Sequence, residues 1–148
     1  MKNHSYRQSL KLKSRTADPA ALKLLRKWFP DLSLLELRRR IQAHEAVYLT
    51  DAEPFLRDGT RKLARLLKEC DGAGIGTELY EEVRSGGVWR SQPMSRDCLR
   101  NALRRSREIE RETLIDIERE TEGFVSPGAL ADIEAETAAH WDGADLEV

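Results

Sequence analysis

The stretch Ala20–Leu49, AALKLLRKWFPDLSLLELRRRIQAHEAVYL, predicts two short helices that meet at a Pro-Asp corner and lead into a strand. Asp18 and Pro19, just before it, suit the cap and first turn of the first helix, because proline has a preset φ and lacks only an N–H that would be unpaired there. Pro30 disfavours a helical conformation for Phe29. The first helix is therefore expected to end at this corner.

The second helix has the stronger start signal. Ser33 followed by Glu36 forms a capping box, with Leu32 and Leu37 at the two staple positions. We expect this helix to turn one row of side chains inward, Arg38 through its aliphatic stem only. That row is Leu34, Leu37, Arg38 and Ile41.

The flanking sequence predicts a small sheet. Residues 6–13 alternate strictly between two faces, which is typical of a half-buried strand. Residues 46–50 are short, branched and aromatic enough for a second strand, and residues 77–83 predict a third. A further helix, capped at 51–54 and closed by Asp71-Gly72, lies between them. The predicted fold class is α+β, a three-stranded sheet with helices on one face in the order β-α-α-β-α-β.

The remaining chain predicts a helical extension. Ser85-Gly86-Gly87 and its polar neighbours indicate a linker. Ser95 then caps a long helix from about residue 96 to residue 122, which Gly123 ends. Ser126-Pro127 opens a last short helix, expected to bury Leu130, Ile133 and Trp141 before an acidic tail. The predicted parts are a unit over 1–84, a linker over 85–94 and a helical extension over 95–148.

The amino-acid composition indicates which broad class of protein this chain belongs to. A chain of 148 residues with 40% hydrophobic and 34% charged residues fits a helix-rich soluble domain with an appendage. No apolar run approaches eighteen residues, and the first residues lack the features of a secretory signal. Cys70 and Cys98 have no metal-ligand spacing and suit two free thiols in a reducing compartment. We therefore expect a cytoplasmic protein that needs no cofactor and does not act at a membrane.

The small net charge of −1 conceals a sharp division along the chain. Residues 1–107 contain 23 Lys and Arg against 13 Asp and Glu, a charge of +10, whereas residues 108–148 contain 2 against 13, a charge of −11. Such a division indicates two oppositely charged surfaces, used on each other or on partners.

The element order over residues 5–83 resembles the C-terminal domain of the bacterial ribosomal stalk protein, and the Clp-protease N-degron adaptor has a similar open sandwich. Three segments fit the stalk pattern: Leu24-Leu25-Arg26, Leu32-Ser33-Leu34, and Leu67-Lys68-Glu69-Cys70 followed by Gly72. The resemblance implies the fold. The lysine with which the stalk domain helps to hold translation factors is replaced by Leu35, so the resemblance does not extend to that surface.

Motifs for catalysis are weak or absent in the sequence. His44-Glu45 does not extend to a zinc-protease motif, because position 48 is tyrosine. Residues 72–76 contain three glycines like a dinucleotide loop, but they follow a helix and precede a strand, the reverse of the phosphate-binding order. Glu136 and His140 stand one helical turn apart without a third ligand, so a solvated pair is favoured over a metal site. We expect no catalysis and no bound metal.

Two charged rows on the long helix are the candidate binding residues. The basic row could follow a phosphate backbone, although a solvated face is favoured. It comprises Arg96, Arg100, Arg104 and Arg107, and it continues to Arg111. The acidic row could bind a cationic partner, with a solvated face again the alternative. It comprises Glu108, Glu112, Asp116 and Glu120.

The absence of catalytic motifs, the small size and the concentrated acid together favour a protein-binding module. Our sharpest hypothesis is an immunity protein, a cytoplasmic antitoxin that neutralises a toxin such as a nuclease by occluding its basic surface or active site. The alternative is a ribosome-associated or nucleic-acid-associated factor that binds through the Arg-rich helix.

Overall fold

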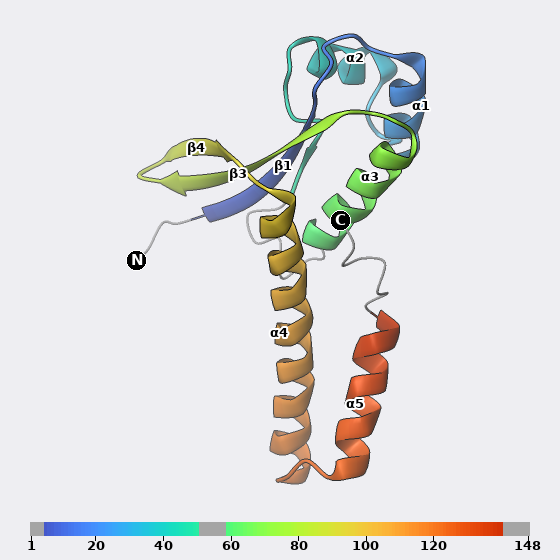
Figure 1. Cartoon of the computed structure of the whole chain (residues 1–148). Coiled ribbons are helices and arrows are strands. Elements are labelled where there is room, and N and C mark those ends of the chain that lie inside the picture. Colours follow the sequence, from blue (N-terminus) through green and yellow to red (C-terminus); the bar gives the residue numbers. More distant parts are fainter. Residues whose placement is uncertain (1–4, 51–58, 141–148) are drawn as a thin grey trace. The chain divides into compact units, whose positions relative to one another are not determined.

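The computed structural model describes residues 5–50 and 59–140, and the chain divides into two compact units, unit 1 (residues 1–96) and unit 2 (residues 97–148). The α+β class is confirmed (Figure 1). Unit 1 contains β1 (Ser5–Leu12), α1 (Pro19–Trp28), α2 (Leu34–Gln42), β2 (Tyr48–Leu49), α3 (Gly59–Gly72), β3 (Thr77–Ser85) and β4 (Val88–Pro93). From the boundary onward come α4 (Arg96–Glu122) and α5 (Pro127–His140).

The sheet has four antiparallel strands in the order β2-β1-β3-β4, not the three that the sequence predicted. The fourth strand occupies most of the expected linker over 85–94. Gly86 and Gly87 have φ angles of 61° and 80° and join β3 to β4. Two successive positive φ angles give a two-residue loop whose twist matches the flanking strands. The glycine pair is therefore a hairpin turn, which the prediction mistook for a linker.

The core of unit 1 lies on one face of the sheet. Leu10 of β1 is opposite Leu79 of β3 in register. Helix α3 covers this face, and the hydroxyl of Thr60 on α3 donates to Oε1 of Gln8 on β1 at 2.8 Å. Gln8 itself is buried and donates from Nε2 to the Tyr6 hydroxyl at 3.3 Å. The largest buried apolar side chains of this unit are Leu10, Leu25, Leu37, Ile41, Val47, Leu63, Leu66 and Leu67.

The predicted helix starts are found, with corrections to α2. The Asp18 carboxylate accepts from the Ala20 N–H at 3.0 Å, and Ser33 Oγ accepts from the Glu36 N–H at 3.0 Å. The Glu36 carboxylate binds Arg39 and Arg40 instead of returning to the Ser33 backbone, so only half of the capping box forms.

The predicted inward row of α2 is also partly wrong. Leu37 and Ile41 are buried, but Leu34 is 50% exposed and Arg38 is exposed. Leu34 is the first residue of the helix and lies a turn before Leu37, so it extends beyond the packed part of α2. The expected start of the next helix at 51–54 lies outside the described residues, and α3 is described from Gly59.

Unit 2 is a helical hairpin (Figure 1). The predicted long helix is confirmed as α4, which Gly123 ends with a φ of 84°. Ser126 Oγ accepts from the Ala129 N–H at 3.1 Å and caps α5. On α5 Ile133 is buried as expected. Leu130 was also expected to be buried, but it is 36% exposed because it lies in the first turn of the helix. Trp141 and the acidic tail lie outside the described residues. Of the helices in the described ranges, none has the length and hydropathy of a membrane span.

Candidate protein-binding surface

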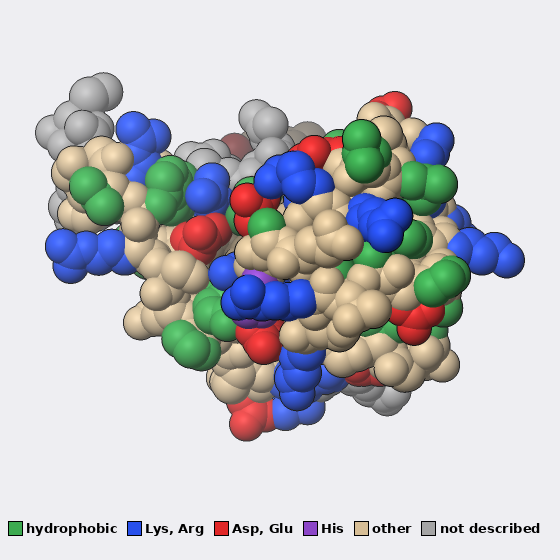
Figure 2. All heavy atoms as spheres, turned by 90° about the horizontal axis from the view of Figure 1, so that it is seen from above, with side chains coloured by type: hydrophobic (Ala, Val, Ile, Leu, Met, Phe, Trp, Pro, Cys, Tyr) green, Lys and Arg blue, Asp and Glu red, His purple; other side chains and the backbone are tan. Residues whose placement is uncertain are grey.

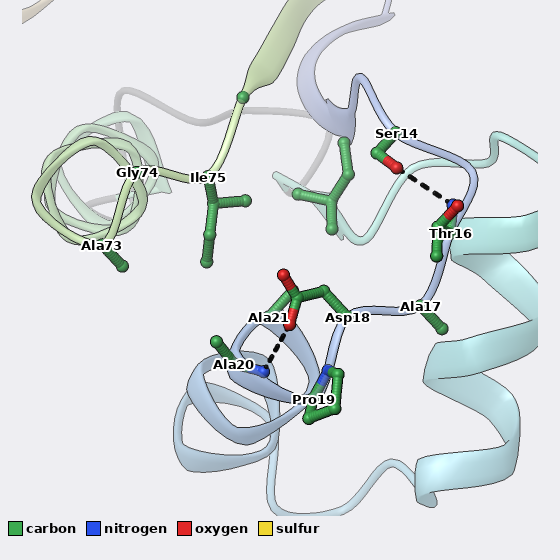
Figure 3. A pocket seen from close by; sticks show the side chains of 12 residues that line it. Ser14, Thr16, Ala17, Asp18, Pro19, Ala20, Ala21, Ala73, Gly74 and Ile75 are labelled. Atoms are coloured by element: carbon green, nitrogen blue, oxygen red, sulfur yellow. Dashed lines mark hydrogen bonds between the residues drawn. The ribbon is translucent and has the colours of Figure 1, made fainter.

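A shallow pocket of about 450 Å³ lies between the loop before α1 and the turn after α3 (Figure 3). Asp18 is the one titratable residue in its lining, and its carboxylate already caps α1 through the Ala20 N–H. The glycine-rich residues 72–76 form a helix stop and turn here, as predicted: Gly74 has a φ of 71°, and the Ile75 N–H donates to the Cys70 carbonyl at 2.8 Å. The lining offers small apolar side chains and no pair of acid and base.

The outer face of the sheet brings together four polar residues that sequence reasoning missed. His44 Nε2 lies 3.3 Å from Glu78 Oε2, and the Tyr80 hydroxyl donates to the same carboxylate at 2.7 Å. These bonds, the one from Tyr80 first, lower the pKa of Glu78, while the Glu78 carboxylate raises the pKa of the Tyr80 hydroxyl. Lys11 lies over the Tyr80 ring at 4.6 Å. His44 has a φ of 55°, in the left-handed region that residues other than glycine rarely adopt, and no sequence pattern predicted this conformation.

A second group on the same face is arranged in the same way. Arg7 Nε lies 2.9 Å from Glu82 Oε2, and its guanidinium stacks over the Trp89 ring at 3.9 Å. On the face of the molecule shown in Figure 2, acidic and basic side chains are interspersed. Because the cations and carboxylates of these two groups contact one another, the groups do not offer an open surface of one charge.

The structure pairs part of the predicted basic row with carboxylates. Arg96 forms a bidentate pair with Asp71 at 2.6 and 2.8 Å, which lowers the pKa of the Asp71 carboxyl and raises that of Arg96. Arg100 binds Asp97, and Arg111 Nε lies 2.6 Å from Glu134 Oε1. Arg104 is exposed and Arg107 half-buried. Three of the five arginines are thus engaged by carboxylates.

The predicted acidic row lies on the exposed surface of α4. Glu108, Glu112, Asp116 and Glu120 are all exposed. Arg105 Nη1 lies 3.3 Å from Glu108 Oε2, and Arg119 Nη1 lies 3.6 Å from Asp116 Oδ1. Both pairs are well exposed and screened by water, so they neutralise the row only weakly.

The hairpin carries more negative charge than this row alone. Helix α5 adds Asp132, Glu134 and Glu136, which are all exposed. From residue 108 to residue 140 there are ten carboxylates against Arg111 and Arg119, a formal charge of −8. We call this surface, the exposed carboxylates of residues 108–136, the acidic hairpin. It is a concentrated negative surface on two connected helices.

The remaining candidate residues are the possible metal ligands and the two cysteines. Within 5–50 and 59–140, no group of three or more His, Cys, Asp and Glu side chains has the arrangement of a metal site. The His140 side chain of the Glu136–His140 pair lies outside the described part of the chain. Burial raises the pKa of the Cys70 thiol to about 11, whereas Cys98 is exposed.

Comparisons with known proteins leave the family open. The chain matches no protein-family model, no curated protein and no solved structure.

Proposed function

We propose that this protein is a non-catalytic binding module, and that the acidic hairpin binds a basic surface of another protein. The observation that carries the proposal is the charge density of the hairpin, ten carboxylates against two arginines over residues 108–140. A negative surface of this kind steers a positively charged partner and accelerates association.

The position of these charges supports binding rather than stability. Glu118, Glu120 and Glu122 lie in the last turns of α4, where the negative end of the helix dipole disfavours carboxylates. Like charges four residues apart, as at Glu108 and Glu112, cost a few tenths of a kcal/mol more. A cationic partner reverses both penalties, so the free hairpin is poised to bind one.

The partner that best fits is a protein whose working surface is basic. A nuclease needs such a surface for its substrate, and a negatively charged inhibitor competes with nucleic acid for it. In its sharpest form the proposal is therefore an immunity protein that neutralises a nuclease-like toxin by occluding this surface.

The proposal is tested by using the tagged chain to capture its partner proteins from its own cells. The wild type is compared with the double variant Glu112→Lys/Asp116→Lys. Both residues are exposed, so the double variant should fold normally. It should bind the captured basic protein at least tenfold more weakly, equivalent to about 1.4 kcal/mol. Titration of the purified partner at several salt concentrations provides the measurement.

The matched control is Asp31→Lys/Glu45→Lys, which makes the same charge change at exposed positions of unit 1. It should retain wild-type affinity. Equal affinity of wild type and the hairpin variant would exclude the acidic hairpin as the binding surface. Tight, strongly salt-dependent binding of nucleic acid by the wild type would favour the nucleic-acid alternative instead.

A further inference from the structure

The turn between α4 and α5 is built on hydrogen bonds at both ends. The Gly123 N–H donates to the Arg119 carbonyl at 2.8 Å and closes α4. Ser126 caps α5 through its hydroxyl, and the Leu130 N–H donates to the Ser126 carbonyl at 2.9 Å. A left-handed glycine thus ends α4, and a capped Ser-Pro start opens α5.

This turn holds an exposed aromatic ring. Phe124 follows Gly123, a position from which an apolar side chain usually packs back on the third or fourth residue from the end of the helix. Here those residues are Arg119 and Glu118, which provide no apolar side chain. Phe124 is accordingly 64% exposed.

Two further apolar side chains are exposed on either side of the bend. Ile117 in the last turns of α4 is 54% exposed, and Leu130 in the first turn of α5 is 36% exposed. We call Ile117, Phe124 and Leu130 the apolar tip. Carboxylates lie near them along the chain: Glu118, Glu120 and Glu122 lie between Ile117 and Phe124, and Asp132 follows Leu130.

We propose that Phe124 anchors the partner, and that the partner segment is both basic and apolar, such as an amphipathic helix rich in Lys and Leu. This inference rests on the proposed function and names the chemistry of its partner. Rigid aromatic side chains at the centre of an interface supply most of the binding energy, while surrounding charges set register and association rate. The apolar tip provides the anchor, and the carboxylates on either side provide the complementary charge.

Two synthetic peptides of equal length and charge serve as probes, one composed of Lys and Leu at helical spacing and the other of Lys and Ser. The wild type should bind the Lys-Leu peptide about tenfold more tightly, because burial of a large apolar side chain contributes at this scale. Phe124→Ser should lose that preference and keep its affinity for the Lys-Ser peptide. Val88→Ser, at an apolar position of unit 1 that is 58% exposed, should change neither affinity.

The outcomes separate the inference from the function on which it rests. If the wild type binds both peptides equally, or if Phe124→Ser retains the preference, the apolar anchor is wrong while the acidic surface stands. If the wild type binds neither peptide at low salt, the acidic surface fails and the anchor fails with it. Circular dichroism of each variant verifies that the helices remain folded.

Discussion

Unit 1 and the acidic hairpin use their charges in opposite ways. In unit 1 carboxylates are bound by neighbouring groups: Glu36 by Arg39 and Arg40, Glu82 by Arg7, Asp71 by Arg96. In the hairpin the carboxylates outnumber the arginines five to one over residues 108–140, and Glu112 has no ion pair with a described residue. Each of these unit 1 carboxylates is thus paired with a cation, whereas the hairpin carries a large excess of carboxylates over cations.

The comparison separates what holds the fold from what is available to a partner. The side chains of these unit 1 pairs are 17% to 54% exposed and so remain in contact with water, and pairs of that kind each contribute about 1 kcal/mol or less. Stability of unit 1 must therefore come mainly from its buried leucines, and its ion pairs adjust it. Glu134 of α5 pairs with Arg111 of α4, and the other ion pairs of the hairpin carboxylates are exposed and add little stability.

The largest expected effect on stability comes from truncating a buried leucine of unit 1. Leu67→Ala should lower the free energy of unfolding by about 3 kcal/mol, because Leu67 on α3 is fully buried and its truncation leaves a cavity. Urea denaturation followed by circular dichroism measures the change. Leu35→Ala, at a side chain that is 78% exposed, is the control and should shift stability by less than about 0.5 kcal/mol. Equal effects of the two variants would contradict the assigned core.

A smaller test concerns a buried hydroxyl on α5. The Thr137 hydroxyl is buried, and among the described residues none is a hydrogen-bond partner of its Oγ1. Thr137→Val keeps the shape and removes the unpaired hydroxyl, so it should raise the free energy of unfolding by about 1 kcal/mol. Thr113→Val is the comparison, since the Thr113 hydroxyl is exposed and donates to the Ile109 carbonyl. A destabilised Thr137→Val variant would show that the hydroxyl is satisfied in solution.

Local chemistry in the sequence predicted the helices well. Ser33, Asp18-Pro19 and Gly123 each act within one helical turn of their own position, so their effects are independent of the rest of the fold. The sheet was harder, because Gly86-Gly87 is compatible with either a linker or a hairpin. The pairing of β3 with β4 across the turn, for example Val83 opposite Arg90, distinguishes them, and that pairing depends on the folded sheet.

The candidate site was predictable where it follows helix periodicity and unpredictable where it depends on tertiary contacts. Four-residue spacing placed Glu108, Glu112 and Asp116 on the exposed surface of α4. The capture of Arg96 by Asp71 could not be foreseen, since the two lie 25 residues apart on different helices. Phe124 was missed for a different reason: its exposure follows from the charged residues at 118 and 119, a signal that was present in the sequence.

The smallest predicted effect is that of an ion pair within unit 1. Asp71→Asn should lower the free energy of unfolding by about 0.5 kcal/mol at neutral pH, because the bidentate pair with Arg96 is about two-fifths exposed and partly screened. Arg96 lowers the folded-state pKa of the Asp71 carboxyl, so the contribution is complete above the ordinary pKa of 3.8 and is lost as the pH falls through the lower folded value.

The difference in stability between wild type and Asp71→Asn should accordingly be constant near neutrality and vanish in acid. Urea denaturation at a series of pH values measures it, with Asp31→Asn as the control, because Asp31 is exposed in the loop between α1 and α2. A difference that persists in strong acid would mean that Asp71 acts through its shape or its hydrogen bonds rather than through its charge. In that case the charge of the Asp71–Arg96 pair would contribute nothing to the free energy of unfolding of unit 1.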